Sequence, residues 1–89
     1  MNAQIICEIQ REQEHGRTKY GSGPNDLAHD DAMPDEMWHR CIDDHNLRAD
    51  KSTPMERRQH LIKVAGLAVS AIESFDRKLV LDNPGSRKK

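Results

Sequence analysis

Apolar residues recur at intervals of three and four along the C-terminal third of the chain, a spacing typical of an amphipathic helix. Thr53 and Glu56 form a capping box at its start, with Pro54 at the first helical position. Asn83, Pro84 and Gly85 supply a stop signal. We therefore expect a helix over residues 54–80. Its central apolar positions are Leu61, Ala65, Ala68, Ile72, Phe75 and Leu79.

The apolar sector of this helix is unusually broad, because Ile62, Val64 and Val69 flank the central positions and leave only a narrow polar strip. A helix with so little polar surface needs neighbours on several sides, more than two shorter helices of the same chain supply. We therefore expect a homo-oligomer, a dimer or larger, in which this helix is central. Gly66 and Ser70, four residues apart, would permit a close helix crossing.

Two shorter helices are expected over residues 3–15 and 34–48. Pro34 opens the second, followed by acidic residues that complement the positive end of the helix dipole. The first carries an isoleucine stripe and should stop at Gly16. Residues 16–33 hold three glycines, a proline, Asn25 and Asp26, which predicts a long loop.

These elements predict an all-α fold, a three-helix antiparallel arrangement around the long C-terminal helix, completed by oligomerisation. Residues 1–82 should form a single helical domain and residues 83–89 a flexible basic tail. At 89 residues, the chain buries only about 60 to 65% of its unfolded surface, so its own core is marginal.

The formal net charge of -1 gives no long-range field to attract nucleic acid, so direct nucleic-acid binding is not expected. The longest apolar run, around residues 64–72, is too short to cross a bilayer, and no signal peptide is readable at the N-terminus. Cys7 and Cys41 lack Cys-x-x-Cys spacing, which suits a reducing compartment. We expect a cytoplasmic protein that does not contact membranes.

Antiparallel packing would bring the end of the first helix, the start of the second and the end of the third to one pole. Carboxylates converging there repel one another unless a cation separates them, and oxygen ligands suit Mg²⁺ or Mn²⁺. The residues expected at this pole are Glu8, Glu12, His29, Asp30, Asp31, Glu36, Glu73 and Asp76.

Each feature of this pole also has a purely structural interpretation. Acidic residues at helical spacing are commonly solvated surface groups, and Arg11 is an ordinary charge partner for Glu8 and Glu12. Asp30 or Asp31 could equally cap the second helix by accepting hydrogen bonds from its first N–H groups.

Basic residues beside the pole are candidate phosphate contacts, because guanidinium and ammonium groups match phosphate oxygens. Arg17 and Lys19 lie in the expected loop, and Lys63 lies on the polar strip of the long helix. The sequence contains no P-loop, dinucleotide-binding glycine motif or nucleophile elbow, which excludes those classes of nucleotide-binding protein and hydrolase.

Several short segments of the sequence, between residues 8 and 78, resemble small proteins of tailed phages. Some of those proteins are similar to the MazG-like all-α nucleotide pyrophosphohydrolases. The segments are Glu12-Gln13 with Gly16, His29-Asp30-Asp31, Glu36-Met37-Trp38, Leu61-Ile62-Lys63-Val64-Ala65, and Ala71-Ile72-Glu73-Ser74-Phe75-Asp76-Arg77-Lys78.

This resemblance implies a Mg²⁺ site between a Glu-Glu-x-x-Glu helix and a Glu-x-x-Asp helix, where water attacks a nucleoside triphosphate and releases pyrophosphate. Glu73 and Asp76 match the second motif, whereas residues 8–14 keep neither the doubled glutamate nor its spacing. The expected roles are metal binding by Glu12, Glu36, Glu73 and Asp76, orientation of the water by His29 or Asp30, and phosphate binding by Arg17, Lys19 and Lys63.

Two functions follow as hypotheses. The first is Mg²⁺-dependent nucleotide binding or pyrophosphohydrolysis by a phage-encoded protein. The second is a non-enzymatic interaction protein that binds and inhibits a host factor, for example in a defence system. The predicted convergence of carboxylates favours nucleotide binding or hydrolysis. The incomplete first acidic motif favours the interaction protein, so catalysis stays an open question.

Overall fold

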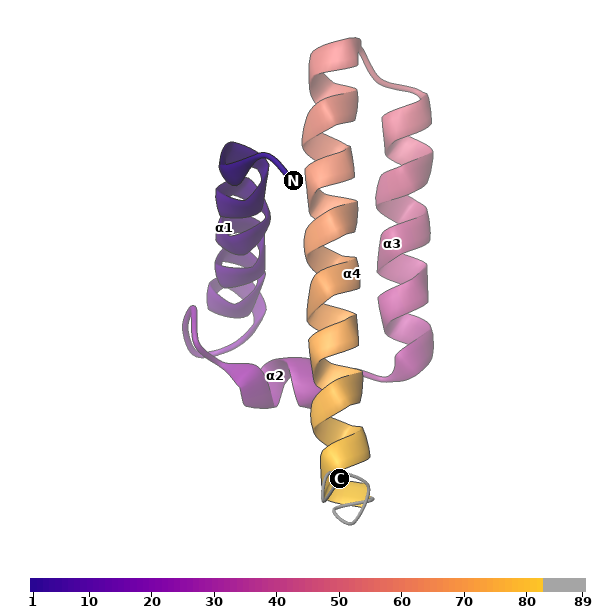
Figure 1. Ribbon diagram of the computed structural model, residues 1–89. Coiled ribbons are helices and arrows are strands. Elements are labelled where there is room, and N and C mark those ends of the chain that lie inside the picture. The colour runs from indigo at the N-terminus through magenta and orange to yellow at the C-terminus, as the bar shows by residue number, and fades with distance from the viewer. Residues whose placement is uncertain (83–89) are drawn as a thin grey trace.

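The computed structural model describes residues 1–82, with side chains through residue 79, and this part of the chain is entirely α-helical in its regular structure. The predicted all-α class is therefore confirmed, with one helix more than expected (Figure 1). The predicted basic tail lies outside the described residues. The helices are α1 (Ala3–Tyr20), α2 (Leu27–Ala32), α3 (Asp35–Asp50) and α4 (Pro54–Asp82).

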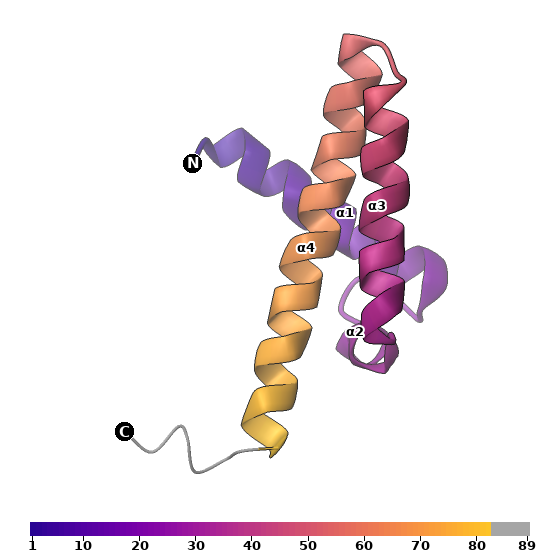
Figure 2. The same cartoon turned by 90° about the vertical axis from the view of Figure 1, so that its right-hand side faces the viewer.

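Helix α4 begins where the sequence predicts. Thr53 Oγ1 accepts a hydrogen bond from the Glu56 backbone N–H (3.4 Å) and donates one to the Glu56 carboxylate (2.7 Å), so the two residues of the predicted capping box meet at the helix start. A short turn connects α3 to α4, so the two helices run antiparallel side by side (Figures 1 and 2). Arg57 Nε donates to the Ala49 carbonyl (3.0 Å) beside this turn. Both α3 and α4 are thus predicted correctly to within about two residues.

Helix α1 packs on a different side of α4 from α3, at an inclined angle (Figure 2). The crossing is close at Gly66, where an added Cβ would lie 3.1 Å from the Glu12 Cβ and 3.6 Å from the Ile9 carbonyl oxygen. The prediction that Gly66 permits a close helix crossing is therefore confirmed. Ile9 is buried at this contact and is 9% exposed.

The predicted stop of the first helix at Gly16 is wrong, because α1 continues to Tyr20. A glycine inside a helix costs only about 1 kcal/mol relative to alanine, and Arg17 and Lys19 in the last turn complement the negative end of the helix dipole. The predicted loop over residues 16–33 is correspondingly too long, since it loses its first residues to α1 and contains α2.

The apolar core within one chain is small. In the described part, the buried hydrophobic residues are Ile9, Trp38, Ala49 and Ala71, so two of the four are alanines. Large apolar side chains along one side of α4 stay about half exposed: Leu61 (46%), Ile72 (59%) and Leu79 (57%). We call this side of α4 the apolar seam. It consists of Leu61, Ala65, Ala68, Ile72, Phe75 and Leu79.

Candidate functional site

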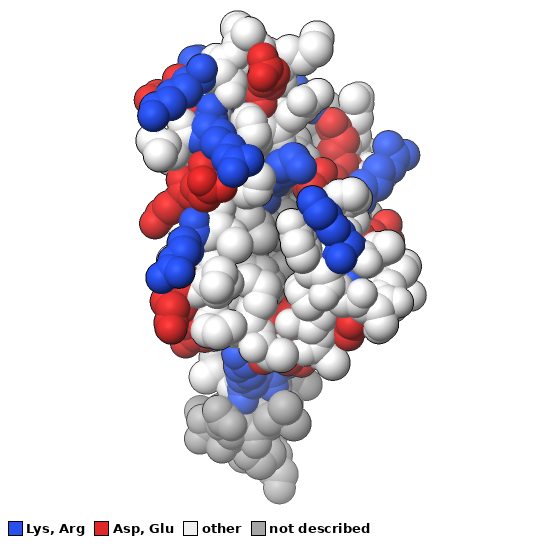
Figure 3. Space-filling view, turned by 180° about the vertical axis from the view of Figure 1, so that it is seen from behind, with Lys and Arg blue, Asp and Glu red and all other residues white. Residues whose placement is uncertain are grey.

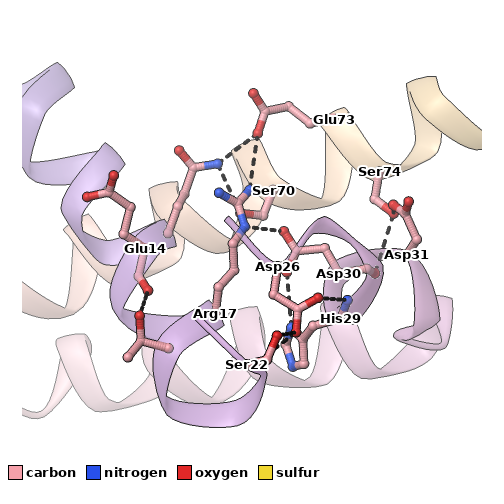
Figure 4. Close-up of polar contacts among 12 residues, drawn as sticks. Glu14, Arg17, Ser22, Asp26, His29, Asp30, Asp31, Ser70, Glu73 and Ser74 are labelled. Carbon is pink, nitrogen blue, oxygen red and sulfur yellow. Dashed lines mark hydrogen bonds and ion pairs between the residues drawn. The ribbon is translucent and has the colours of Figure 1, made fainter. Parts of the chain in front are cut away.

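The C-terminal end of α1, the short helix α2 and the second half of α4 meet in a network of charged side chains (Figure 4). Arg17 Nε donates to Asp30 Oδ2 at 2.9 Å, and His29 Nδ1 lies 3.1 Å from Asp30 Oδ1. Asp30 is 3% exposed, although it is a carboxylate. A buried carboxylate requires a paired cation, so Arg17 compensates for its loss of water.

A second pair joins α2 to α4. Arg77 donates to Asp31 from Nε (3.0 Å) and Nη2 (2.8 Å), and the buried Ser74 hydroxyl donates to the same carboxylate at 2.8 Å. These hydrogen bonds, the one from Arg77 above all, hold the pKa of Asp31 below its ordinary value. The same contact raises the pKa of Arg77. Both groups are therefore charged at neutral pH, and together they fix α2 against α4.

The turn between α1 and α2 positions this network. Asp26 caps α2 by accepting a hydrogen bond from the His29 N–H (3.0 Å), and it also accepts from the Ser22 N–H (2.8 Å). The bonds from the Ser22 and His29 backbone lower the pKa of Asp26. At Gly21 an added Cβ would lie 2.5 Å from Asp26 Oδ2 and 2.7 Å from the Arg17 carbonyl oxygen. The turn therefore needs glycine for this close approach.

A groove opens between α1 and α4 above this network. Gln13 Nε2 bridges the two helices, donating to Ser70 Oγ (3.0 Å) and Glu73 Oε1 (2.8 Å). Arg17 Nη2 lies 3.8 Å from the same glutamate oxygen. We call this site the polar groove. It is lined by Gln10, Gln13, Glu14, Arg17, Leu27, Glu73 and Arg77.

Four of the predicted site residues come together at this end of the molecule. Arg17, His29 and Asp30 are linked by the contacts above, and Glu73 lies across the groove from Arg17. They come from three helices and are separated by up to 56 positions in the sequence. The predicted meeting of helix ends thus brings these groups together.

The other predicted residues lie elsewhere. Glu12 pairs with Lys63 (3.5 Å) along the contact between α1 and α4. Glu36 and Asp76 are exposed and do not line the polar groove, and Lys19 places its ammonium 5.2 Å from the centre of the Tyr20 ring. In residues 1–79, no three side chains of the His, Cys, Asp or Glu type form a group that could share one metal ion. The four predicted metal ligands are therefore not gathered into one cluster.

One structural interpretation of the acidic residues is wrong, and another is incomplete. Neither Asp30 nor Asp31 caps α3, because Pro34 occupies the N-cap and provides no side-chain hydrogen bond. Glu8 does not depend on Arg11 alone, since Arg58 of α4 donates to both of its carboxylate oxygens at 2.8 and 2.6 Å. That contact lowers the pKa of Glu8.

Sequence reasoning missed several residues that build the site. Asp26 and Gly21 shape the turn, and Gln13 bridges the helices. The segment Gly23-Pro24-Asn25-Asp26, which precedes His29, is a sequence pattern that indicates a capped helix start. Nothing in the sequence indicates the bridging role of Gln13, because it depends on how α1 lies on α4.

On the face seen in Figure 3, basic and acidic side chains are interspersed around a largely uncharged central area, and neither sign forms an extended area. This agrees with the net charge of -1. No helix in the described part of the chain is both long and apolar enough for a membrane span. Comparison of this chain with models of known protein families, with curated proteins and with solved structures finds no match.

Proposed function

We propose that the polar groove binds a Mg²⁺–nucleoside triphosphate complex, and that the associated reaction is release of pyrophosphate. The observation that carries this proposal is the placement of two guanidinium groups and a half-exposed carboxylate, Arg17, Arg77 and Glu73, on the walls of one groove. Arginine donors suit phosphate oxygens, and a carboxylate suits the accompanying cation.

The arginines keep donors for a phosphate after making their contacts within the chain. A guanidinium carries five N–H groups. Arg17 uses Nε for Asp30, and Arg77 uses Nε and Nη2 for Asp31. The aspartates therefore act as positioning residues in this proposal, because they hold the two guanidinium groups at the groove. This role also suits the burial of Asp30 better than direct contact with a water molecule does.

Glu73 is the best-placed metal contact. Its side chain is 51% exposed, and its Oε1 is oriented by the hydrogen bond from Gln13. Mg²⁺ in nucleotide sites is usually held by one or two protein carboxylates, with phosphate oxygens and water completing its octahedron. Glu14, which lines the same groove, can supply a second carboxylate. A site of this kind does not need a cluster of three protein ligands.

The reaction class comes from the resemblance to MazG-like pyrophosphohydrolases of phages and their relatives, together with this groove. A bound divalent cation would lower the pKa of the attacking water and neutralise phosphate charge. Within the network, His29 carries the imidazole suited to accept a proton from that water; it lies beside Asp30, is 22% exposed at its side chain and does not line the groove.

The test is titration calorimetry of a non-hydrolysable nucleoside triphosphate in the presence and absence of Mg²⁺. The parent chain should bind only with Mg²⁺, and Glu73→Gln should weaken binding by about tenfold or more. Glu36→Gln is the matched control, because that carboxylate lies outside the groove and should leave binding unchanged. Absence of Mg²⁺-dependent binding in the parent would refute the proposal, as would equal effects of the two substitutions.

A second candidate function is inhibition of a host factor by direct binding. The observation that favours it is exposure of large apolar side chains away from the groove, such as Tyr20 (70%) and Met55 (75%). This function requires no metal. It predicts a stoichiometric complex with a host protein that persists in a chelator and is weakened by Tyr20→Ser or Met55→Ser. If the complex requires Mg²⁺ or is absent, this candidate fails.

A further inference from the structure

The apolar seam of α4 has the spacing of a helix that pairs with another helix. Its positions alternate steps of four and three residues from Leu61 to Leu79, so each pair of steps spans the seven residues of a coiled-coil heptad. No charged residue occupies any of these positions.

Neither neighbouring helix of the same chain covers Leu61, Ile72 and Leu79 of this seam, whereas Ala65, Ala68 and Phe75 are partly buried. Helix α1 contacts α4 through Gly66, Ser70 and Glu73, while α3 contacts it near Arg57 and His60. At 100° per residue, Phe75 projects in the same direction as Arg57 and borders the side that faces α3, whereas Ala65 and Ile72 lie midway between the two contact sets. The exposure of Leu61, Ile72 and Leu79 agrees with this geometry.

We propose that a second copy of this chain docks on the seam, with the two α4 helices antiparallel around a twofold axis near Ser70. In this register Leu61 faces Leu79 of the second copy, Ala65 faces its Phe75, and Ala68 faces its Ile72. Each alanine is thus opposite a large side chain, so the two helix axes stay evenly spaced and the layers fill.

The sizes of the seam residues select this occupant and this direction. Parallel pairing would put Ala65 and Ala68 opposite themselves and Phe75 opposite itself, leaving a gap at one end and crowding at the other. The seam is therefore complementary to itself when reversed, which a twofold dimer interface requires. An unrelated partner has no reason to match this order of small and large residues.

A groove at one end of the seam fits the same arrangement. Leu61 and the exposed Leu47 of α3 line it together with Ala49 and Arg57. In the antiparallel register, Leu79 of the second copy lies over Leu61 at the edge of this groove. The dimer would therefore cover Leu47 as well, and this proposal is independent of ligand binding at the polar groove.

The first test is sedimentation equilibrium of the full chain. The parent should have twice the 10.2 kDa chain mass, and Ile72→Glu should raise the dissociation constant of the dimer by at least about tenfold. Met55→Glu is the matched control, since Met55 is 75% exposed on the same helix but outside the seam. A monomeric parent would overturn the proposal, as would a dimer that Ile72→Glu leaves as tight as before.

The second test determines the register of the two α4 helices by disulfide cross-linking and does not rely on a charged substitution. In a background with Cys7→Ser and Cys41→Ser, the variants Leu61→Cys and Leu79→Cys should form a disulfide-linked dimer when mixed and oxidised. Neither should link efficiently alone. Efficient linking of Leu61→Cys to itself would indicate parallel helices and overturn the proposed arrangement, and no linking in the mixture would overturn the pairing.

Discussion

The charged network at the polar groove and the apolar seam on α4 differ in what they bury: the network buries polar side chains, and the seam exposes apolar ones. At the network, Arg17–Asp30 and Arg77–Asp31 join three helices of one chain, and the buried polar residues are Asp30, Ser70 and Ser74. Along the seam, leucine and isoleucine side chains stay half exposed. Burial of apolar surface is the larger source of stability, whereas buried ion pairs mostly set geometry. The single chain thus uses polar contacts to fix its shape and leaves large apolar side chains of α4 half exposed.

The largest expected effect comes from breaking the buried ion pair. Arg17→Met should lower the free energy of unfolding by about 3 kcal/mol, because Asp30 would stay buried without its guanidinium partner. Urea denaturation followed by circular dichroism measures this. Arg48→Met is the control, since its exposed pair with Asp44 should contribute no more than about 0.5 kcal/mol. Similar effects of both substitutions would contradict a structural role for the buried pair.

The two glycines within helices give a sharper comparison of helix contacts. Gly66→Val should lower the free energy of unfolding by roughly 1 to 3 kcal/mol, because the added side chain meets Glu12 at the crossing of α1 and α4. Gly16→Ala should raise it by up to about 1 kcal/mol, since nothing lies within 4 Å of an added Cβ there. Thermal melts of both variants test this pair. A stable Gly66→Val variant would mean that the crossing is not close.

The smallest effect concerns His45, which lies between α3 and α4 with its Nδ1 3.5 Å from that of His60. Burial, followed by the charge of Lys63, lowers the pKa of His45 below its ordinary value of 6.5. The neutral form is favoured by folding, so its contribution to stability is present above about pH 6.5 and lost as pH falls through the lower folded pKa. His45→Gln should flatten the fall in stability between neutral and mildly acidic pH, whereas His15→Gln, at an exposed position, should not.

Local signals in the sequence were sufficient for some elements and not for others. The start of α4 was predictable, because Thr53 and Glu56 interact within one turn and Pro54 suits the first helical position. Gly66 was recognisable as a crossing point, since Gly66 and Ser70 are small residues four positions apart on one side of the helix.

The charged pairs were not predictable, because they depend on how distant helices align. Glu8 was expected to use its neighbour Arg11, but the structure also gives it Arg58 from α4. Asp30 looked like a surface, capping or metal-binding residue, and its burial against Arg17 required α1 to run past Gly16. The cost of Gly16 inside α1 is small, and the contact between Arg17 and Asp30 can outweigh it.

Thermal unfolding at a series of protein concentrations tests most directly whether the seam is completed by a second copy of the chain. If dimerisation through α4 supplies missing apolar burial, the Tm must rise with protein concentration, since the folded dimer is favoured by mass action. The rise should disappear in Ile72→Glu. A Tm of the parent chain that stays the same over the whole concentration range would show that one chain is stable alone, with its seam facing water.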